Sequence, residues 1–400
     1  MFRPKPGYRL ELHVLKSHGA SRLNRDGADR PKTINIGGVR RLRISSQSEK
    51  YSIRESEIFK QFLEEADQKY GATRMIRTRR AGEIIKDRIQ GKILEHGRDP
   101  MDYEEQIDAA LASLSRLFAK NGKASDTADT KQAIAFSETE IEYLAEIMFS
   151  VEKDGELAIN DCADTLKNMN DERNSVGPLS PELQLFGRFT TASVFLKNID
   201  TPLQLNHGFT VHEARIEHDY WTTVDDLNKQ SGKQGGAHLD LRPFGSGVFY
   251  HYYCLDVPLL SRNIAAAFPV LEPERNLEMT QDLIAAFLYA ILIRNPVGGQ
   301  TGHANHDLPS CAYVTYGNAF PYSAQSVFEC PVQPEQHGGY ITAAKKCFEQ
   351  WRKERKKRYG IFCGFEQCMG LGETDVDLQA MVEASIEEAT PAIRRELFSA

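Results

Sequence analysis

The chain has 400 residues, of which 41% are hydrophobic and 26% charged, so it can bury at least one full core. Its longest apolar run, Leu283 to Ile293, is far shorter than the roughly 20 residues that a membrane-spanning helix needs, and we see no charged-then-apolar leader. Seven scattered cysteines without a C-x-x-C pair argue against a disulfide framework or a zinc ribbon. We therefore expect a cytoplasmic protein with reduced thiols and no cofactor.

The net charge of −7 is unevenly distributed along the chain. Residues 1–60 carry 14 Lys and Arg against six acids, a net charge of +8, which leaves −15 for the remainder. Such an N-terminal region attracts a polyanion even on an acidic protein, because salt screens charges beyond about 10 Å. Charge alone fits a nucleic-acid site and an ordinary solvated basic face equally well.

The first 60 residues predict two strand regions and a helix. Residues 10–14 alternate between apolar and polar, the pattern of a half-buried strand, and a polar loop over 17–32 follows. Residues 34–36 and 39–44 then predict two short strands joined by a glycine turn. A capping box at Ser46 to Glu49, followed by apolar residues at helical spacing, predicts the start of a helix.

The middle of the chain predicts a helical insertion and then strands. Residues 65–175 are polar with helical periodicity and contain a second capping box, Ser137 to Glu140. Alternating or apolar runs rich in aromatics over 209–216 and 248–257 predict strands of a central sheet. The segment 228–236 between them predicts the tip of a long hairpin.

The last third predicts a helix over 275–294, a strand over 311–316 and an unusually basic helix over 341–358. Strands and helices in this order indicate an α+β fold with helices packed against a sheet.

The most informative run is the basic segment from Arg40 to Arg54. Gln47, Lys50 and Arg54 are spaced to share one helical face close to unpaired backbone N–H groups. A phosphate there meets the positive end of the helix and several cations, with Ser45 and Ser48 as further donors. An ordinary capped helix with exposed basic residues fits the same local pattern.

Two other segments are candidate sites. His303, His306 and Asp307 have a spacing that suits metal ligands, but they lie in a Gly-rich segment without further clustered Cys or His, which favours a surface loop. Asp26 is a carboxylate beside the basic region and could assist cleavage of a phosphodiester. An Asx turn at Asp26-Gly27 is the simplest account of that residue.

The ordered motifs of the chain resemble those of the CasC family, the backbone subunit of type I-E CRISPR Cascade. The motifs that carry the resemblance are LHVLKSH (12–18), LNRD (23–26), GGVRRLRISSQS (37–48), GRF (187–189), WTTVDDL (221–227), GAHL (236–239) and FGSGVFY (244–250). They span most of the chain and are specific jointly.

The resemblance implies an RRM-like (ferredoxin-like) palm with a helical fingers insertion and a β-hairpin-type thumb. The corresponding division is palm 1–64, fingers 65–180, palm 181–217, thumb 218–247 and palm 248–400. Such a subunit is no enzyme: it polymerises along a CRISPR guide RNA and presents it for pairing with target DNA in antiviral defence. The implied partners are further copies of itself, the large, small and guide-end-capping Cascade subunits, and a nuclease.

The resemblance also implies an RNA-binding set. Its members in the palm are Arg25, Arg40, Arg41, Arg43, Ser45, Gln47, Lys50 and Arg54. The remaining members are Arg188, Phe189, Trp221 and Thr222, of which Phe189 and Trp221 are expected to wedge between bases as stacking partners.

Two alternatives stay open. Related backbone subunits of type III complexes cut target RNA with an aspartate in a comparable loop, so this chain could be a type III-like endoribonuclease that uses Asp26. It could also be a stand-alone RRM-like binding protein. The sequence departs from the family at Tyr51, where a second basic residue is expected, in a longer thumb segment, and in the basic helix near the C-terminus.

Overall fold

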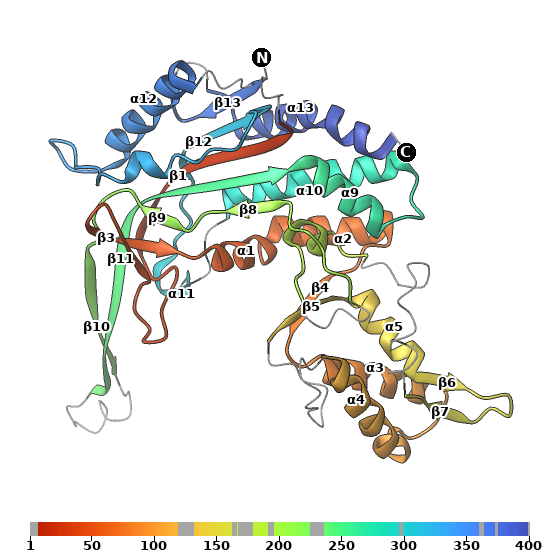
Figure 1. The fold of residues 1–400 in the computed structure, drawn as a ribbon. Helices are drawn as coiled ribbons and strands as arrows, with labels where there is room; N and C mark the ends of the chain where they lie inside the picture. Colours follow the sequence, from red (N-terminus) through yellow and green to blue (C-terminus); the bar gives the residue numbers. More distant parts are fainter. Residues whose placement is uncertain are drawn as a thin grey trace. The chain divides into compact units, whose positions relative to one another are not determined.

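A computed structural model describes residues 7–118, 132–161, 166, 179–190, 196–224, 236–294, 296, 298, 300–359, 364–372 and 375–398 (Figure 1). The chain folds into two compact units. Unit 1 comprises residues 1–60, 204–257 and 281–392, and unit 2 comprises residues 61–203, 258–280 and 393–400.

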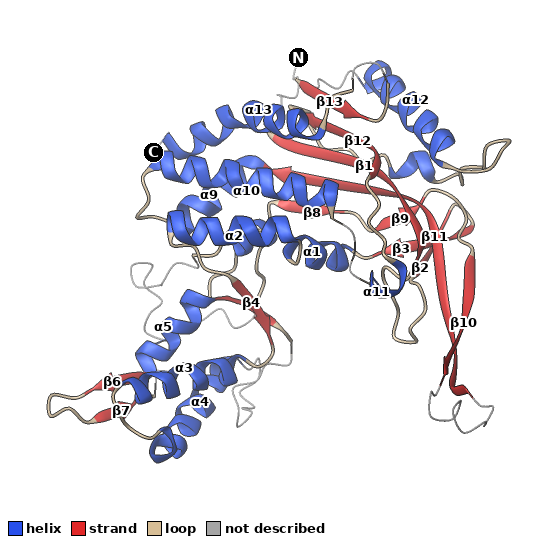
Figure 2. Ribbon diagram, turned by 180° about the vertical axis from the view of Figure 1, so that it is seen from behind, coloured by secondary structure: helices blue, strands red, loops and turns tan. Residues whose placement is uncertain are grey.

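Unit 1 is built on one large antiparallel sheet (Figure 2). Its described strands follow the order β13-β12-β1-β11-β9-β3-β2, and β8 and β10 also pair with β11. Their bounds are β1 Arg9–Ser21, β2 Thr33–Ile36, β3 Val39–Ile44, β8 Leu203–Leu205, β9 Gly208–Thr210, β10 Ile216–Val224, β11 Gly236–Asp256, β12 Pro309–Tyr316 and β13 Phe365–Met369. The predicted mixed α and β architecture is thereby confirmed, with a large antiparallel sheet.

Strand β1 is longer than its sequence pattern predicted. It lies between β11 and β12 and continues through Ser21, so the predicted loop over 17–32 begins later. The polar residues Lys16 and His18 are buried along with the apolar ones. Glu11 and His13 are buried as well, so the prediction of a half-buried strand is wrong: β1 is covered on both faces because it lies in the middle of the sheet between two helix-covered faces.

The β2–β3 hairpin has the glycine turn that the sequence predicted. Gly37 and Gly38 have φ angles of 61° and 79°, the left-handed conformation that a two-residue hairpin turn requires. A Cβ at Gly37 would lie 1.8 Å from the Glu329 carbonyl oxygen, so glycine is also needed for close approach of the loop after β12.

The two faces of the unit 1 sheet are covered by different helices. On one face, Tyr250 of β11 and Tyr313 of β12 lie in a core with Phe328 of η2 (Gln325–Phe328) and Phe348 of α12 (Ile341–Tyr359). On the other face, Tyr253 of β11 packs against α10 (Pro273–Ile293) and hydrogen-bonds to α1 (Ser46–Arg54). The predicted C-terminal helices and strand are present, and α13 (Leu378–Phe398) follows them.

The hairpin of β10 and β11 extends from the sheet. Its strands pair in register from Ile216↔Gly245 to Thr222↔Leu239. Tyr220 and Leu241 are paired across the strands and both are exposed. The predicted tip over 228–236 lies outside the described residues except for Gly236.

Unit 2 is mainly helical but also contains two small strand pairs that the sequence did not predict, β4–β5 and β6–β7. Its core is lined by isoleucines of α3 at four-residue spacing, Ile85, Ile89 and Ile93, which pack with apolar residues of α4 and α5. The bounds are α2 Glu57–Tyr70 (which begins in unit 1), β4 Met75–Thr78, α3 Ala81–Glu95, η1 Pro100–Tyr103, α4 Glu104–Phe118, β5 Ile134–Ser137, α5 Glu138–Met148, β6 Phe149–Val151, β7 Leu157–Ile159, α7 Pro181–Phe186 and α9 Val257–Ala267.

The capping box predicted at Ser137 and Glu140 is confirmed. The Ser137 hydroxyl accepts from the Glu140 N–H and the Glu140 carboxylate accepts from the Ser137 N–H. Helix α10 is long and apolar enough to cross a membrane by length and composition, and 67% of that window is buried inside the protein, as in a core helix. The finer division into palm, fingers and thumb stays a prediction.

Candidate nucleic-acid interface

The loop over residues 22–32 is pinned to the start of α1. The Asn24 side-chain oxygen accepts from the Ser45 N–H at 3.1 Å, and the Asn24 carbonyl accepts from the Lys32 N–H at 2.8 Å. The Lys32 carbonyl in turn accepts from the Arg43 N–H at 2.8 Å. These bonds hold the loop, the end of β3 and the first turn of α1 as one body.

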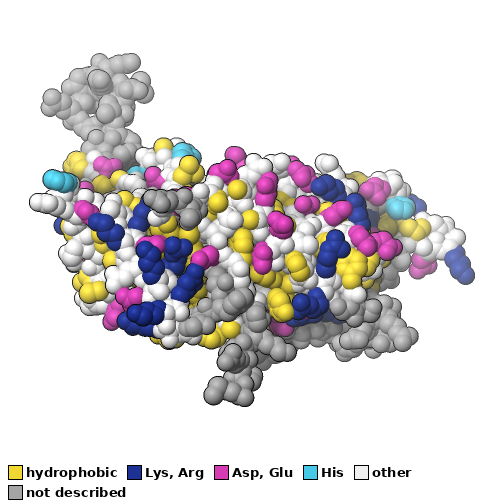
Figure 3. All heavy atoms as spheres, turned by 90° about the horizontal axis from the view of Figure 1, so that it is seen from above, with side chains coloured by type: hydrophobic (Ala, Val, Ile, Leu, Met, Phe, Trp, Pro, Cys, Tyr) yellow, Lys and Arg dark blue, Asp and Glu magenta, His cyan; other side chains and the backbone are white. Residues whose placement is uncertain are grey.

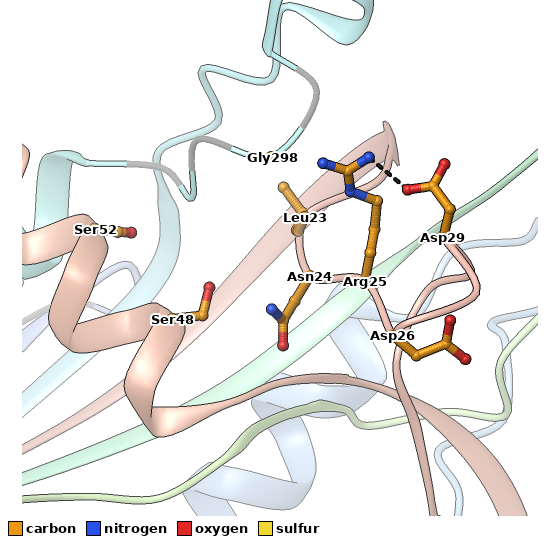
Figure 4. Close-up of a pocket in the computed structure, with 8 residues that line it drawn as sticks. All are labelled: Leu23, Asn24, Arg25, Asp26, Asp29, Ser48, Ser52 and Gly298. Carbon is orange, nitrogen blue, oxygen red and sulfur yellow. Dashed lines mark hydrogen bonds and ion pairs between the residues drawn. The ribbon is translucent and has the colours of Figure 1, made fainter. Parts of the chain in front are cut away.

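Between this loop and α1 lies an open pocket of about 430 Å³ with a polar lining (Figure 4). Ser48 and Ser52 point from α1 toward the loop that carries Asn24 and Arg25. The full lining is Leu23, Asn24, Arg25, Asp26, Asp29, Ser48, Ser52 and Gly298. Hydroxyls, an amide and a guanidinium around an open hollow are groups that hold phosphate and sugar oxygens.

Gly298 lines the pocket, and its backbone lies very close to that of Arg22 and Leu23. A Cβ there would lie 2.6 Å from the carbonyl oxygens of both Arg22 and Leu23. The segment after α10 therefore packs directly on the chain that enters the loop. The sequence analysis missed Asn24, Ser52 and Gly298 as lining residues; the Asn in the LNRD motif was the available signal.

The two aspartates of the loop are engaged within it. Asp26 Oδ1 accepts from the N–H groups of Ala28 at 2.9 Å and Arg30 at 3.0 Å, and Oδ2 accepts from Arg30 Nε at 3.2 Å. The backbone hydrogen bond from Arg30 is the largest cause that lowers the pKa of Asp26. Asp29, at φ 61°, pairs with Arg22 and with Arg25 at 2.5 Å. The Asx turn expected at Asp26 is present.

The N-cap of helix α1 lies one residue earlier than the capping box predicted. Its N-cap is Ser45, whose hydroxyl accepts from the Ser48 N–H at 3.3 Å. The prediction that Ser46 and Glu49 form a capping box is wrong, because the Glu49 carboxylate is buried and pairs with Arg294 instead. Ser45 is itself buried, so it supports the interface as the cap of α1.

Glu49 is the centre of a buried polar network beneath α1. Besides Arg294, its carboxylate accepts from Tyr253 Oη at 3.0 Å and lies 3.4 Å from His251 Nδ1. Arg294 also donates to Ser52 Oγ at 2.8 Å, and the Arg294 carbonyl accepts from Lys16 Nζ at 2.6 Å. The network thus ties α1 to β1, to β11 and to the end of α10.

Burial and charge set the protonation of this network. Burial by itself raises the pKa of Glu49, but the Arg294 guanidinium, His251 and two hydrogen bonds outweigh it and lower that pKa to about 2. Burial, reinforced by Arg294, lowers the pKa of Lys16 to about 7. Glu49 therefore stays ionised at neutral pH and holds the underside of the pocket-bearing helix.

Several predicted RNA-binding residues of the 22–32 loop, β3 and α1 lie on accessible surface, and Arg25 among them lines the pocket. Arg25, Arg40 and Gln47 are exposed, and Arg43, Lys50 and Arg54 are partly exposed. Arg43 lies 3.2 Å from His207 Nδ1, and burial followed by the charge of Arg43 lowers the pKa of His207. Lys50 and Arg54 lie one turn apart on α1. That these groups bind RNA stays a prediction.

Two predicted arginines lie inside the protein. Arg41 is fully buried, and its guanidinium donates to the carbonyl oxygens of Thr210, Phe328 and Glu329 at 3.0–3.1 Å. Arg188 is buried in unit 2, where it forms a two-bond ion pair with Glu140 at 2.7 and 2.8 Å. We correct the assignment of both residues to the RNA-facing set, because a phosphate cannot replace these internal partners without opening the core.

Phe189 has the opposite environment from its neighbour. Its side chain is 89% exposed, while Arg188 beside it is fixed by Glu140 and by the carbonyls of Ala135 and Lys197. The anchored Arg188 side chain thus holds the chain segment that presents the Phe189 ring to solvent. For the other two predicted residues, Trp221 and Thr222, the structure describes the strand β10 but not the side chains.

The segment with the spacing of metal ligands, His303 to Asp307, forms no metal-binding group. Over the ranges that the structure describes, no three His, Cys, Asp or Glu residues are placed to hold a metal ion. Asp307 accepts from the Gly19 N–H at 3.2 Å, and His306 is exposed. Of the cysteines, Cys254, Cys311 and Cys368 are buried, and Cys330 and Cys347 are exposed thiols.

Comparison with known proteins decides the family. A family model described as "CT1975-like protein" matches residues 10–392. The chain belongs to this family. The match bears out the resemblance to the CasC family that the sequence motifs indicated.

The CT1975-like chain is also similar in fold to two solved structures. One is a chain of a CRISPR RNA-guided surveillance complex, pre-nicking, with a TM-score of 0.71 and 23% identity over 95% of this chain and 100% of that one. The other is a chain of a CRISPR RNA-guided surveillance complex, with a TM-score of 0.55 and 19% identity over 94% of this chain and 99% of that one. The comparison with curated proteins found no match.

Replacing Glu49 by glutamine tests the network beneath the pocket. We expect Glu49→Gln to lower the free energy of unfolding by about 3–5 kcal/mol, because Arg294 stays buried without its counter-charge. The folded-state pKa of about 2 lies below the ordinary glutamate value of 4.5, so the contribution of Glu49 to stability is present above pH 4.5 and is lost as the pH falls toward 2. Urea denaturation should show a weaker pH dependence of the free energy of unfolding in that window for the variant.

Glu335→Gln, which removes the surface ion-pair partner of Lys346, is the control and should cost about 1 kcal/mol or less. Equal effects of the two changes would contradict this account of the network.

The adjacent residues Arg40 and Arg41 form a matched pair for separating surface from core. Arg41→Ala should lower the free energy of unfolding by at least about 2 kcal/mol, since it leaves three carbonyl oxygens without their charged donor. Arg40→Ala should leave the melting temperature almost unchanged because its side chain is exposed. Thermal melting of the two variants side by side checks this, and an equally stable Arg41→Ala protein would refute the internal role of Arg41.

Proposed function

We propose that this chain is the guide-RNA-binding backbone subunit of a Cascade-type CRISPR surveillance complex. In this proposal several copies polymerise along one CRISPR guide RNA and present it for pairing with target DNA. The remaining partners in this proposal are the large, small and guide-end-capping subunits of the complex and a nuclease. The chain itself supplies binding and geometry and no catalytic group.

The observation that carries the proposal is the polar pocket between the 22–32 loop and α1 in a member of this family. The pocket opens among the cations of a strongly basic N-terminal segment, and its walls are fixed by the Asn24 and Glu49 contacts. Backbone contacts of this kind position a nucleic acid without reading its sequence. That suits a protein that must hold guides of many sequences.

The family resemblance extends the proposal to the rest of the chain. The unit 1 sheet with its helices would serve as the RRM-like palm, the helical part of unit 2 as the fingers, and the β10–β11 hairpin as the thumb. Exposed aromatic rings are suited to stacking on displaced bases, at about 1–3 kcal/mol per base in single-strand binders. Phe189 is the described residue that fits this role best, and Trp221 is the second candidate.

The endoribonuclease alternative is disfavoured by the surroundings of Asp26. Its carboxylate already accepts two backbone hydrogen bonds and pairs with Arg30, and its pKa is lowered. A general base needs an accessible lone pair and a pKa near the working pH. The Asx turn therefore accounts for Asp26 better than catalysis does.

Removing Lys50 and Arg54 together tests the phosphate-binding role of α1. The double alanine variant should bind guide RNA of any sequence more weakly. The slope of log affinity against log salt should become shallower by about 1.4, because fewer counterions are released from the single strand. The control is Lys346→Ala/Lys353→Ala on α12, which removes the same charge from the opposite face of the sheet. Fluorescence anisotropy at several salt concentrations measures both. An unchanged affinity and slope in the first variant would remove α1 from the interface.

Asp26→Ala tests the alternative function. The assembled protein should leave guide-paired RNA and DNA intact with or without a divalent metal, and the variant should behave identically. Denaturing gels of labelled target strands would show the result. Cutting at regular intervals that disappears in Asp26→Ala would replace the proposed function by the ribonuclease.

Phe189→Ala tests the wedge in comparison with its buried neighbour Phe186. The Phe189 variant should melt almost normally as a free subunit and should lose guide affinity or regular base exposure in the assembled complex. Phe186→Ala should instead destabilise the free subunit by about 3–5 kcal/mol through a cavity. If the regular pattern of chemical probing survives in the Phe189 variant, Trp221 becomes the better candidate.

A further inference from the structure

Helix α12 carries a concentration of positive charge that the proposed guide site does not use. Between Ile341 and Tyr359 the chain has eight Lys and Arg against two Glu, on a protein whose total net charge is −7. In the view from above, Lys and Arg side chains gather on the side of the molecule where α12 lies, with acidic side chains among them (Figure 3).

The inner face of α12 is fixed on the sheet. Phe348 packs 5.6 Å from the His13 ring, and Ala344 and Phe348 are fully buried. The Arg355 guanidinium lies 3.9 Å from the Tyr322 ring centroid and donates to Tyr313 Oη at 3.0 Å. Because these contacts hold the helix along its length, its outer face is a rigid surface.

The outer face presents a straight basic stripe. Lys346, Gln350, Lys353 and Lys357 are all exposed and recur at spacings of four, three and four residues. On a helix with 3.6 residues per turn they fall within an arc of about 60° and extend for about 16 Å. The surface is therefore a line of lysines along a fixed rod.

The charges of this stripe are held only by weak contacts. Lys346 pairs with Glu335 at 3.0 Å and Lys353 with Glu349 at 3.3 Å, and the two lysine side chains are 70% and 73% exposed. Within the described part of the chain, Lys357 has no ion-pair partner. Exposed pairs of this kind contribute about 1 kcal/mol or less, so the lysines can exchange their partners for phosphates.

Stability of the helix does not account for the stripe. Lys356, Lys357 and Arg358 lie in the last turn, where positive charge complements the helix dipole. Lys346 and Lys353 lie in earlier turns, where that effect has faded.

We propose that the stripe formed by Lys346, Lys353 and Lys357 is a second polyanion-binding surface, which contacts the phosphates of a DNA duplex. It lies on the face of the sheet opposite α1 and its pocket, so it engages a nucleic acid other than the guide bound in that pocket. A rigid line of point charges matches a rigid row of phosphates and reads no sequence. Single-strand sites instead alternate cations with aromatic platforms, and the stripe consists of Lys and Gln.

This inference does not rest on the guide-binding proposal, and one experiment separates them. The full chain carrying Lys346→Ala, Lys353→Ala and Lys357→Ala is titrated with a short duplex DNA of arbitrary sequence at several salt concentrations. The slope of log affinity against log salt should fall by about 2.7, since three contacts each release close to one counterion. Guide-RNA affinity should be retained in this variant, whereas Lys50→Ala/Arg54→Ala should show the reverse pattern.

A charge-preserving variant guards against a folding artefact. Lys346→Arg/Lys353→Arg/Lys357→Arg should keep the duplex affinity and the salt slope of the unchanged protein. If the triple alanine variant binds duplex DNA with the original affinity and slope, the proposal is overturned. It is also overturned if polyglutamate, as a probe for an acidic protein partner, binds in an α12-dependent manner while duplex DNA does not.

Discussion

The buried ion pair between Glu49 and Arg294 fixes the arrangement on which the candidate interface depends. Glu49 belongs to the short helix α1, and Arg294 follows the long helix α10, about 250 residues further along the chain. Because both groups are almost fully buried, neither can turn away without leaving a charge unpaired. The ion pair therefore fixes the face of α1 that carries Ser48 and Ser52 toward the loop.

The same constraint explains why so many polar groups lie beneath α1. Lys16 donates to the Arg294 carbonyl, and Tyr253 donates to Glu49, so the sheet beneath the helix is bonded to it by directional contacts. Directional contacts of this kind specify a single arrangement of the helix on the sheet. The opposite face of the sheet has an aromatic core around His13 and Phe348, which supports α12 and its lysines. One sheet thus carries two basic surfaces with different supports.

Patterns local in the sequence predicted much of the fold. Glycines at Gly37 and Gly38 marked a turn whose positive φ angles the structure has, and the Ser137 box marked the start of α5. The length of β1 escaped prediction because Lys16 and His18 are buried polar residues that interrupt the hydrophobic pattern. The cap of α1 was placed one residue late because Glu49 matches a capping box by spacing, whereas its carboxylate is drawn inward by Arg294. Long-range partners of this kind leave no local signal.

The candidate site shows the same division between local and long-range information. The basic run from Arg40 to Arg54 was recognised from its composition and its resemblance to a family, yet adjacent arginines in it have opposite environments. Arg40 is exposed and Arg41 is buried, because alternate residues of β3 point to opposite faces of the sheet. Phe189 is likewise exposed, whereas the adjacent Arg188 is buried. Motif matching identified the segments, and only the tertiary structure assigned each side chain to the surface or to the interior.

The central claim is that this chain assembles in several copies on a guide RNA. The most direct measurement is the size and the 260 to 280 nm absorbance ratio of the full chain purified after coexpression with its partner subunits, with and without a guide. The account predicts a large particle of defined size that contains RNA of defined length when the guide is present, and smaller RNA-free protein when it is absent. A particle of the same size and absorbance ratio in both preparations would contradict it.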